Sequence, residues 1–141
     1  MNEKFMDIAL LEAKKAFKKE ETPVGCVIVK NNKIISKAHN KKNKTNRIID
    51  HSEIIAITKA NKKLKNWRLE GCDLYVTLEP CPMCASAIEQ ARINNVYTIT
   101  SNNDTNNNEI ITKIFKNTNF IKYDGNKESE LLLKKFFLKR R

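Results

Sequence analysis

The order of helical and strand-like segments is the feature of this chain that most restricts its fold. After an opening pair of β-branched, apolar segments, helical periodicity and short apolar runs alternate along the sequence. Helices are predicted over residues 3–19, 52–64, 82–91, 109–117 and 129–140, and strands over 24–30, 34–38, 73–78, 94–101 and 120–124. This alternation predicts an α/β fold with three layers, α/β/α, around a mixed five-stranded sheet.

Local signals support the proposed elements. Asn31 and Asn32 separate the first two strands and tolerate positive φ, so these strands are predicted to form a hairpin. Pro82 suits the first turn of a helix. The polar stretch 39–50 is predicted to be a loop, and the length of 141 residues suits a single domain spanning residues 1–141.

Net charge limits the classes of partner. The chain carries a formal charge of +11, which predicts a polyanionic partner, most often nucleic acid. Coding bias toward Lys and Asn in an AT-rich genome is the alternative source of this charge, and both stay open. The first residues include Glu3 and Asp7 without a small-residue cleavage site, and the longest apolar runs fall far short of the ~20 residues of a membrane helix. We therefore expect a cytoplasmic protein without a membrane association.

The four cysteines point to a metal rather than to disulfides. Cys81 and Cys84 form a P-C-x-x-C motif, and in a reducing compartment paired cysteines are more often metal ligands or redox groups. Zinc is the metal that such a pair favours. A structural zinc site needs four protein ligands, but Cys26 and Cys72 lie in or next to apolar strands and are predicted to be core residues.

His51 is the candidate for a third ligand. It directly precedes a predicted helix, and the cysteine pair opens another; in α/β folds, such strand-to-helix turns line the crevice where ligands bind. Taken alone, His51 fits a capping or core histidine better than a metal ligand. Glu53 could be a first-turn charge favoured by the helix dipole, or a proton carrier beside a metal.

The combination H-x-E followed by P-C-x-x-C is the signature of the zinc nucleobase deaminases. The chain resembles the bacterial tRNA adenosine deaminases, within the cytidine deaminase-like superfamily, along most of its length. The resemblance rests on the stretches ETPVGCVIV, AHN, HSEI, NWRLEGCDLYVTLEPCPMC and LLLKKFFLKRR. It is weakest between residues 99 and 127.

This resemblance implies a fold of the cytidine deaminase type and a hydrolytic reaction. One zinc ion per chain would be held by His51, Cys81 and Cys84, with water as the fourth ligand. Glu53 would be the catalytic residue that moves protons between water, base and departing amine. The expected reaction converts the wobble adenosine of a tRNA anticodon loop to inosine.

The resemblance also implies roles for residues near the metal. Asn40 would bind the substrate base, although a turn residue at a strand end is the alternative. His39 would stack on or contact the RNA, with an ordinary surface histidine as the alternative. Ser52 stands where the family commonly has Ala, and little consequence is expected. For Glu79 the backbone is expected to matter more than the carboxylate. The loop after the fourth strand lacks the family's glycine, and its substrate contact is expected from one of Asn102, Asn103 and Asp104.

The partners implied are tRNA, through its anticodon stem-loop, and a second copy of the chain in a homodimer. Two other functions stay open. The first is a zinc deaminase of a free base or nucleotide, of the cytosine or guanine type, which would not need a broad basic surface. The second is a non-catalytic RNA-binding module with structural zinc, which would need a fourth protein ligand and would give Glu53 no task.

Overall fold

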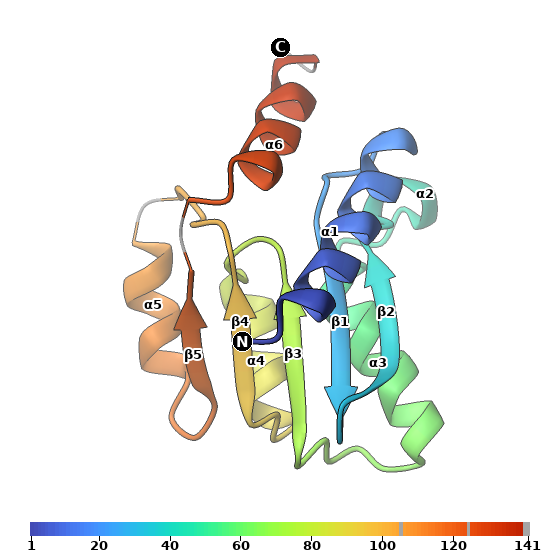
Figure 1. Cartoon of the computed structure of the whole chain (residues 1–141), viewed down its shortest axis with the longest axis vertical. Helices are drawn as coiled ribbons and strands as arrows, with labels where there is room; N and C mark the ends of the chain where they lie inside the picture. The colour runs from blue at the N-terminus through green and yellow to red at the C-terminus, as the bar shows by residue number, and fades with distance from the viewer. Residues whose placement is uncertain (105, 124, 140–141) are drawn as a thin grey trace.

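The computed structural model describes residues 1–104, 106–123 and 125–139. Its centre is one sheet of five strands in the order β2-β1-β3-β4-β5 (Figure 1). The strands are β1 Gly25–Lys30, β2 Lys33–His39, β3 Cys72–Val76, β4 Asn95–Thr98 and β5 Asn119–Lys122. β1 pairs antiparallel with both β2 and β3, whereas β3, β4 and β5 are mutually parallel. The predicted mixed five-stranded sheet is confirmed.

The hairpin between β1 and β2 forms as predicted. Asn31 and Asn32 both take positive φ, 52° and 63°, the conformation of the two-residue turn that matches the twist of antiparallel strands. The partner of β1 changes from Ser36 at Ile28 to Ile34 at Val29, so the pairing skips Ile35 and β2 carries a bulge there. The hairpin places β2 at the edge of the sheet.

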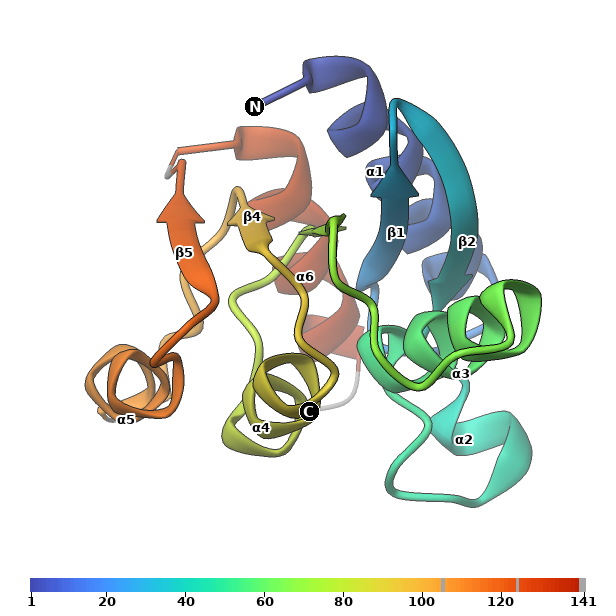
Figure 2. The same ribbon diagram turned by 90° about the horizontal axis from the view of Figure 1, so that it is seen from below.

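Helices cover both faces of the sheet. They are α1 Glu3–Lys18, α2 Lys42–Thr45, α3 Ser52–Leu64, α4 Pro82–Gln90, α5 Asn107–Ile114 and α6 Lys127–Lys139. Figure 2 shows α3, α4 and α5 on one side of the sheet and α1 on the other. α6 lies beyond the carboxyl ends of β3 and β4 (Figure 1). It contacts α1, and an ion pair joins Lys14 on α1 to Glu128 on α6. This arrangement confirms the expected α/β/α layers.

Alternating side chains of β1 feed both cores. Cys26 and Ile28 pack in the core under α3 and α4, whereas Val27 and Val29 pack in the core under α1. All four side chains are buried, as expected for a strand that is covered on both faces. The prediction that Cys26 and Cys72 are core residues is confirmed, because both are fully buried free thiols.

Gly25 sets how closely α1 approaches the sheet. A Cβ atom at this position would lie only 1.9 Å from the carbonyl oxygen of Ala9 and 2.6 Å from the backbone nitrogen of Ala13. Only glycine allows two backbones to come this close. The helix therefore rests directly on the amino end of β1.

Three sequence expectations need correction or restriction. The stretch predicted to be a loop, 39–50, contains the short helix α2, which buries no side chain and therefore has no apolar periodicity to reveal it. The last residue of β2, His39, also falls within that stretch. Residue 105 of the 102–108 loop, residue 124 of the last predicted strand and residue 140 of the last predicted helix lie outside the described residues.

Among the residues described, no helix combines the length and the apolar character needed to cross a membrane.

Candidate metal centre and active site

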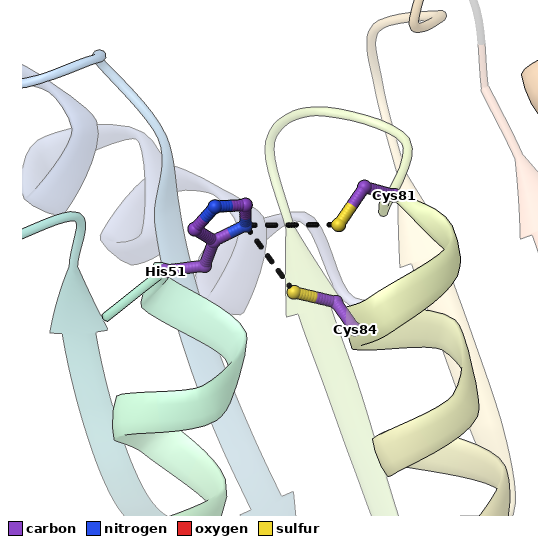
Figure 3. Close-up of side chains that lie close together, drawn as sticks. All are labelled: His51, Cys81 and Cys84. Carbon is purple, nitrogen blue, oxygen red and sulfur yellow. Dashed lines mark hydrogen bonds between the residues drawn. The ribbon is translucent and has the colours of Figure 1, made fainter. Parts of the chain in front are cut away.

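His51 ends the connection from α2 and is the N-cap residue of α3. Its side chain makes no capping hydrogen bond, so the capping alternative does not apply. The turn before it is held by Arg47, whose guanidinium donates to both carboxylate oxygens of Asp50 at 3.1 and 2.8 Å. The His51 imidazole points toward the start of α4 (Figure 3).

Cys81 is the N-cap residue of α4, and Cys84 follows one turn later on the same side of the helix. Pro82 occupies the first turn, as predicted. The Nδ1 atom of His51 lies 3.7 Å from the Cys81 sulfur and 3.5 Å from the Cys84 sulfur (Figure 3). The structure thus brings together the three side chains predicted to be ligands.

The spacing of the three donor atoms suits tetrahedral zinc. Zinc–sulfur bonds of about 2.3 Å and zinc–nitrogen bonds of about 2.0–2.1 Å, at a tetrahedral angle, require sulfur and nitrogen to lie about 3.6 Å apart. The two observed separations bracket this value, and all three donor atoms lie within 4.8 Å of one another. Among the described residues, no fourth His, Cys, Asp or Glu joins the group. The donor set fits a zinc site with one open position, the form typical of catalytic zinc.

The electrostatics of the group also favour a cation. A hydrogen bond from the Cys84 thiol, opposed in part by burial, lowers the pKa of Cys81 to about 4. The same bond and burial raise the pKa of Cys84 well above its ordinary range. The hydrogen bond to Cys81 raises the pKa of His51. Zinc-bound cysteines are thiolates, so the lowered pKa of Cys81 suits a metal ligand.

Glu53 lies in the first turn of α3 and is only 3% exposed. Burial raises the pKa of its carboxyl group, while the hydrogen bond from Ser52 opposes this shift. The Ser52 hydroxyl, itself fully buried, donates to Glu53 Oε1 at 2.7 Å. Ser52 therefore contacts the predicted catalytic carboxylate through its hydroxyl group. The alanine that the family commonly has at this position lacks that group.

Asn40 and His39 lie at the carboxyl end of β2, beside this group of side chains. Asn40 Oδ1 accepts a hydrogen bond of 2.7 Å from the Ser52 backbone N–H, which ties the end of β2 to the start of α3. His39 is only 6% exposed, so the surface alternative for it is wrong. Its Nδ1 lies 3.1 Å from Glu12 Oε1 on α1, and it does not join the metal group. A contact of His39 with RNA stays a prediction.

Glu79 corrects the sequence analysis. Its carboxylate, expected to be of minor importance, is buried and accepts hydrogen bonds from Asn107 at 2.8 Å and Asn108 at 3.4 Å. Lys122 on β5 pairs with it at 3.3 Å. The Asn107 side chain also donates to Pro80 O at 3.1 Å, next to the first cysteine ligand. The reason is that a buried carboxylate needs donors. Here the donors are side chains that lie 28 to 43 residues further along the chain.

Sequence reasoning missed Asn107 because it lies within an asparagine-rich stretch that has no periodicity. The substrate contact expected from one of Asn102, Asn103 and Asp104 stays a prediction. Asn102, Asn103 and Asp104 line a cavity of about 840 Å3, together with Leu78 and residues of α6. Leu78 precedes Glu79 and the metal-binding turn in the chain, but none of His51, Cys81 and Cys84 lines this cavity.

The mixed sheet, with a His/Cys/Cys group between two helix N-termini and a buried glutamate beside it, defines a zinc-dependent deaminase architecture. Residues 1–100 match the family described as the cytidine and deoxycytidylate deaminase zinc-binding region. The chain belongs to this family.

Curated relatives and solved structures refine this placement. The chain is 50% identical over 95 residues to a tRNA-specific adenosine deaminase of Bacillus subtilis (strain 168), covering 67% of this chain and 59% of that protein. It is 51% identical over 94 residues to one of Aquifex aeolicus (strain VF5), covering 67% and 62%. The matched segment thus spans about three-fifths of the length of these curated relatives.

Two solved structures are similar along more of their length. One comes from studies of A-to-I editing by tRNA:A34 deaminases at the wobble position; its TM-score is 0.84 at 34% identity, covering 94% of this chain and all of that one. The other is a guanine deaminase of Bacillus subtilis, with a TM-score of 0.69 at 36% identity, covering 72% of this chain and 65% of that one.

Proposed function

We propose that this chain, as one domain of residues 1–141, is a zinc-dependent hydrolase that deaminates the wobble adenosine of a tRNA anticodon loop to inosine. One observation carries the proposal: three donor atoms at zinc-binding distances with a buried carboxylate next to them and no fourth protein ligand among the described residues. The structural-zinc alternative needs that fourth ligand. The similarity to a tRNA:A34 deaminase structure supports the choice of substrate.

The residues of the site divide the chemistry between them. His51, Cys81 and Cys84 hold the zinc ion, which when bound would act as a Lewis acid that activates water. Glu53 accepts one proton of the attacking water and passes it to the ring nitrogen. It then takes the second proton from the added hydroxyl group and gives it to the amine, so that the carbonyl forms and ammonia leaves. Burial suits Glu53 to this task, because a raised pKa brings a carboxyl group closer to the working pH.

Asn40 positions the base in this proposal. Its side-chain oxygen is already bound by the Ser52 backbone N–H, so its NH2 group is the part left to donate to an acceptor atom of the base. The base must leave its stack to reach the site, and an anticodon loop permits this at low cost. His39, held by Glu12, supports the segment that carries Asn40.

The substrate RNA and a second copy of the chain are the proposed partners. The charge of +11 suits a polyanion, and the cavity beside Leu78 offers room for a nucleotide that flanks the target. Ile48 and Ile49 are 68% and 46% exposed just before the metal-binding turn, as suits residues covered in a homodimer. Reduced cysteines and a tRNA substrate together favour the cytoplasm.

Glu53→Gln tests the proposal. Glutamine keeps the size of the side chain and an acceptor for the Ser52 hydroxyl but cannot carry the proton. We expect unchanged zinc content by elemental analysis and inosine formation on an anticodon stem-loop lowered about 10²- to 10⁴-fold. Glu109→Gln, an exposed change on α5, should leave both unchanged. Full turnover in Glu53→Gln would exclude the proposed role of this carboxylate.

Deamination of free guanine is the second candidate, because a guanine deaminase shares the fold at 36% identity. The two functions separate in one assay, in which the stem-loop and free guanine are offered in parallel and inosine and xanthine are measured. We expect inosine in the RNA and no xanthine. Activity confined to the free base would replace the RNA assignment with the guanine assignment.

A further inference from the structure

The edge of the sheet opposite the metal group carries an exposed aromatic side chain stacked with a cation. Trp67, in the loop between α3 and β3, is 57% exposed. The guanidinium carbon of Arg68 lies 4.9 Å from the centre of its ring. The loop is held in shape by Asn61, whose side chain donates to the carbonyl oxygens of residues 66 and 67 at 3.1 and 3.2 Å. Trp67 is thus presented to solvent on an ordered loop.

A polar depression of about 510 Å3 lies next to this stack. Its lining includes Arg68, Arg92, Asn94, Asn95, Asn117 and Asn119, from the loops that enter β3, β4 and β5. These loops lie at the lower edge of the sheet in Figure 1, whereas the metal-binding turns lie at the upper edge. The five residues of β3 separate the two edges by about 16 Å.

The cations of this depression are available to a ligand. Arg92 is exposed and makes no ion pair within the part of the chain that the structure describes. Of the carboxylates in the described residues, Arg68 pairs with that of Glu70, at 3.9 Å between two exposed side chains, which is a weak pairing.

Two nearby acids already have donors. Glu89 accepts from the backbone N–H groups of residues 116–118 at 3.0–3.1 Å. Asp73 accepts from Asn95 at 2.8 Å. Exposed Lys65 and Lys116 add positive charge in the adjoining loops.

We propose that this surface, the Trp67 face, binds single-stranded nucleic acid. A base stacks on Trp67, and Arg68 and Arg92 hold the flanking phosphates, since aromatic rings and arginines together form the usual platform for single strands. Asn94 accepts from the Gly71 N–H through its oxygen, so its NH2 group can donate to the base or sugar. The binding is independent of the deaminase function, because no residue of the metal group takes part.

The fluorescence of Trp67 tests the proposal directly, because it is the only tryptophan in the chain. Titration with a short single-stranded oligoadenylate should quench this fluorescence saturably, with an affinity that falls as salt rises. Trp67→Ala should weaken binding, followed by the anisotropy of a labelled oligonucleotide, about 5- to 100-fold. Arg68→Ala with Arg92→Ala should weaken it at least about 10-fold. Lys4→Ala with Lys18→Ala removes the same charge from α1 and should change affinity less than about twofold.

General charge attraction is the main competitor of a specific Trp67 face. Oligonucleotide binding without quenching would overturn the proposal and favour general charge attraction. Equal weakening by the two double variants would do the same. Equal affinity for inorganic polyphosphate would overturn the stacking of a base. A change in oligomeric state caused by Trp67→Ala would identify a second copy as the occupant instead. Glu53→Gln should still bind the oligonucleotide, and the Trp67 face variants should still deaminate a stem-loop, so that each proposal can fail alone.

Discussion

Gly25 is the point of backbone contact between α1 and β1, and we expect Gly25→Ala to destabilise the protein strongly. The added Cβ would lie 1.9 Å from Ala9 O, 2.6 Å from Ala13 N and 2.8 Å from the Cβ of Glu12. Because two of these atoms belong to the backbone, no change of rotamer relieves the overlap. Non-bonded heavy atoms prefer about 3.5–4.0 Å, so the helix must move away from the strand by more than about 1 Å.

The cost follows from what α1 buries. Its inner side includes Phe5, Met6 and Leu10, and a gap of 0.5–1 Å forfeits about a quarter to a half of the dispersion energy of facing atoms. Together with about 1–3 kcal/mol of overpacking strain, the loss is about 3–5 kcal/mol. A chain of 141 residues unfolds with an entropy of roughly 0.3 kcal/mol/K, so Tm should fall by about 10–17 °C.

Thermal denaturation followed by circular dichroism measures this effect, with Gly71→Ala as the matched control. Gly71 has φ +81°, but its Cβ would meet only the flexible end of Lys30 at 3.5 Å. The control therefore loses only the about 1–2 kcal/mol of left-handed backbone strain. A drop for Gly25→Ala no larger than that of the control would refute the inferred close approach of helix and strand.

Three further perturbations follow from the contacts of the site. Asn107→Ala should cost about 1.5–3 kcal/mol in urea denaturation, because it removes a 2.8 Å donor to the buried Glu79 carboxylate, whereas the longer bond of Asn108 should make Asn108→Ala cost less than about 1 kcal/mol; equal costs would contradict this ranking. Burial lowers the pKa of His39 below 6.5, so the unfolded chain binds more protons and the free energy of unfolding should fall as pH drops below about 6.5. Burial raises the pKa of Glu12, but hydrogen bonds to two basic side chains outweigh it and lower the pKa. The free energy of unfolding should therefore keep falling at lower pH. If its dependence on pH is unchanged in His39→Gln, the His39–Glu12 pair is not the cause. Removal of zinc by a chelator should lower Tm by about 14 °C relative to free zinc at a thousand times its Kd, and a Tm independent of zinc would contradict a site that binds only the folded chain.

The order of elements could be predicted because each helix and strand carries its own local signal. The burial of both faces of β1 explains its continuous apolar run, and the Asn31–Asn32 turn takes the positive φ angles that its residues favour. The helix α2 was missed because it is four residues long and buries none of its side chains. Boundaries shifted by a few residues where polar strand ends, such as those of β4 and β5, lie in loops instead.

The metal ligands of the candidate site could be predicted from the sequence, but the contacts that hold the surrounding segments in place could not. The combination of H-x-E with P-C-x-x-C is a known family signature, so the resemblance indicated that His51, Cys81 and Cys84 share a site. The role of the Glu79 carboxylate depends on Asn107, Asn108 and Lys122, which are 28 to 43 residues away. The same holds for His39, whose partner Glu12 occupies the inner side of a helix that looks ordinary in sequence. Contacts between distant elements of this kind leave no local pattern.

The direction of β1 explains why the metal group and Gly25 belong to one assembly. α3 and α4 begin at the carboxyl ends of the edge strand β2 and of β3, and β1 runs antiparallel between these strands. Its amino end therefore lies at the same edge of the sheet as both helix N-termini. There Gly25 exchanges hydrogen bonds with Thr77, accepting from its N–H at 3.1 Å and donating to its hydroxyl at 3.2 Å. Thr77 starts the turn that carries Glu79 and the two cysteine ligands. A displacement of β1 by α1 would thus reach the metal group through a single residue, so Gly25→Ala should weaken zinc retention as well as stability, whereas Gly71→Ala, at the opposite edge, should leave zinc content unchanged.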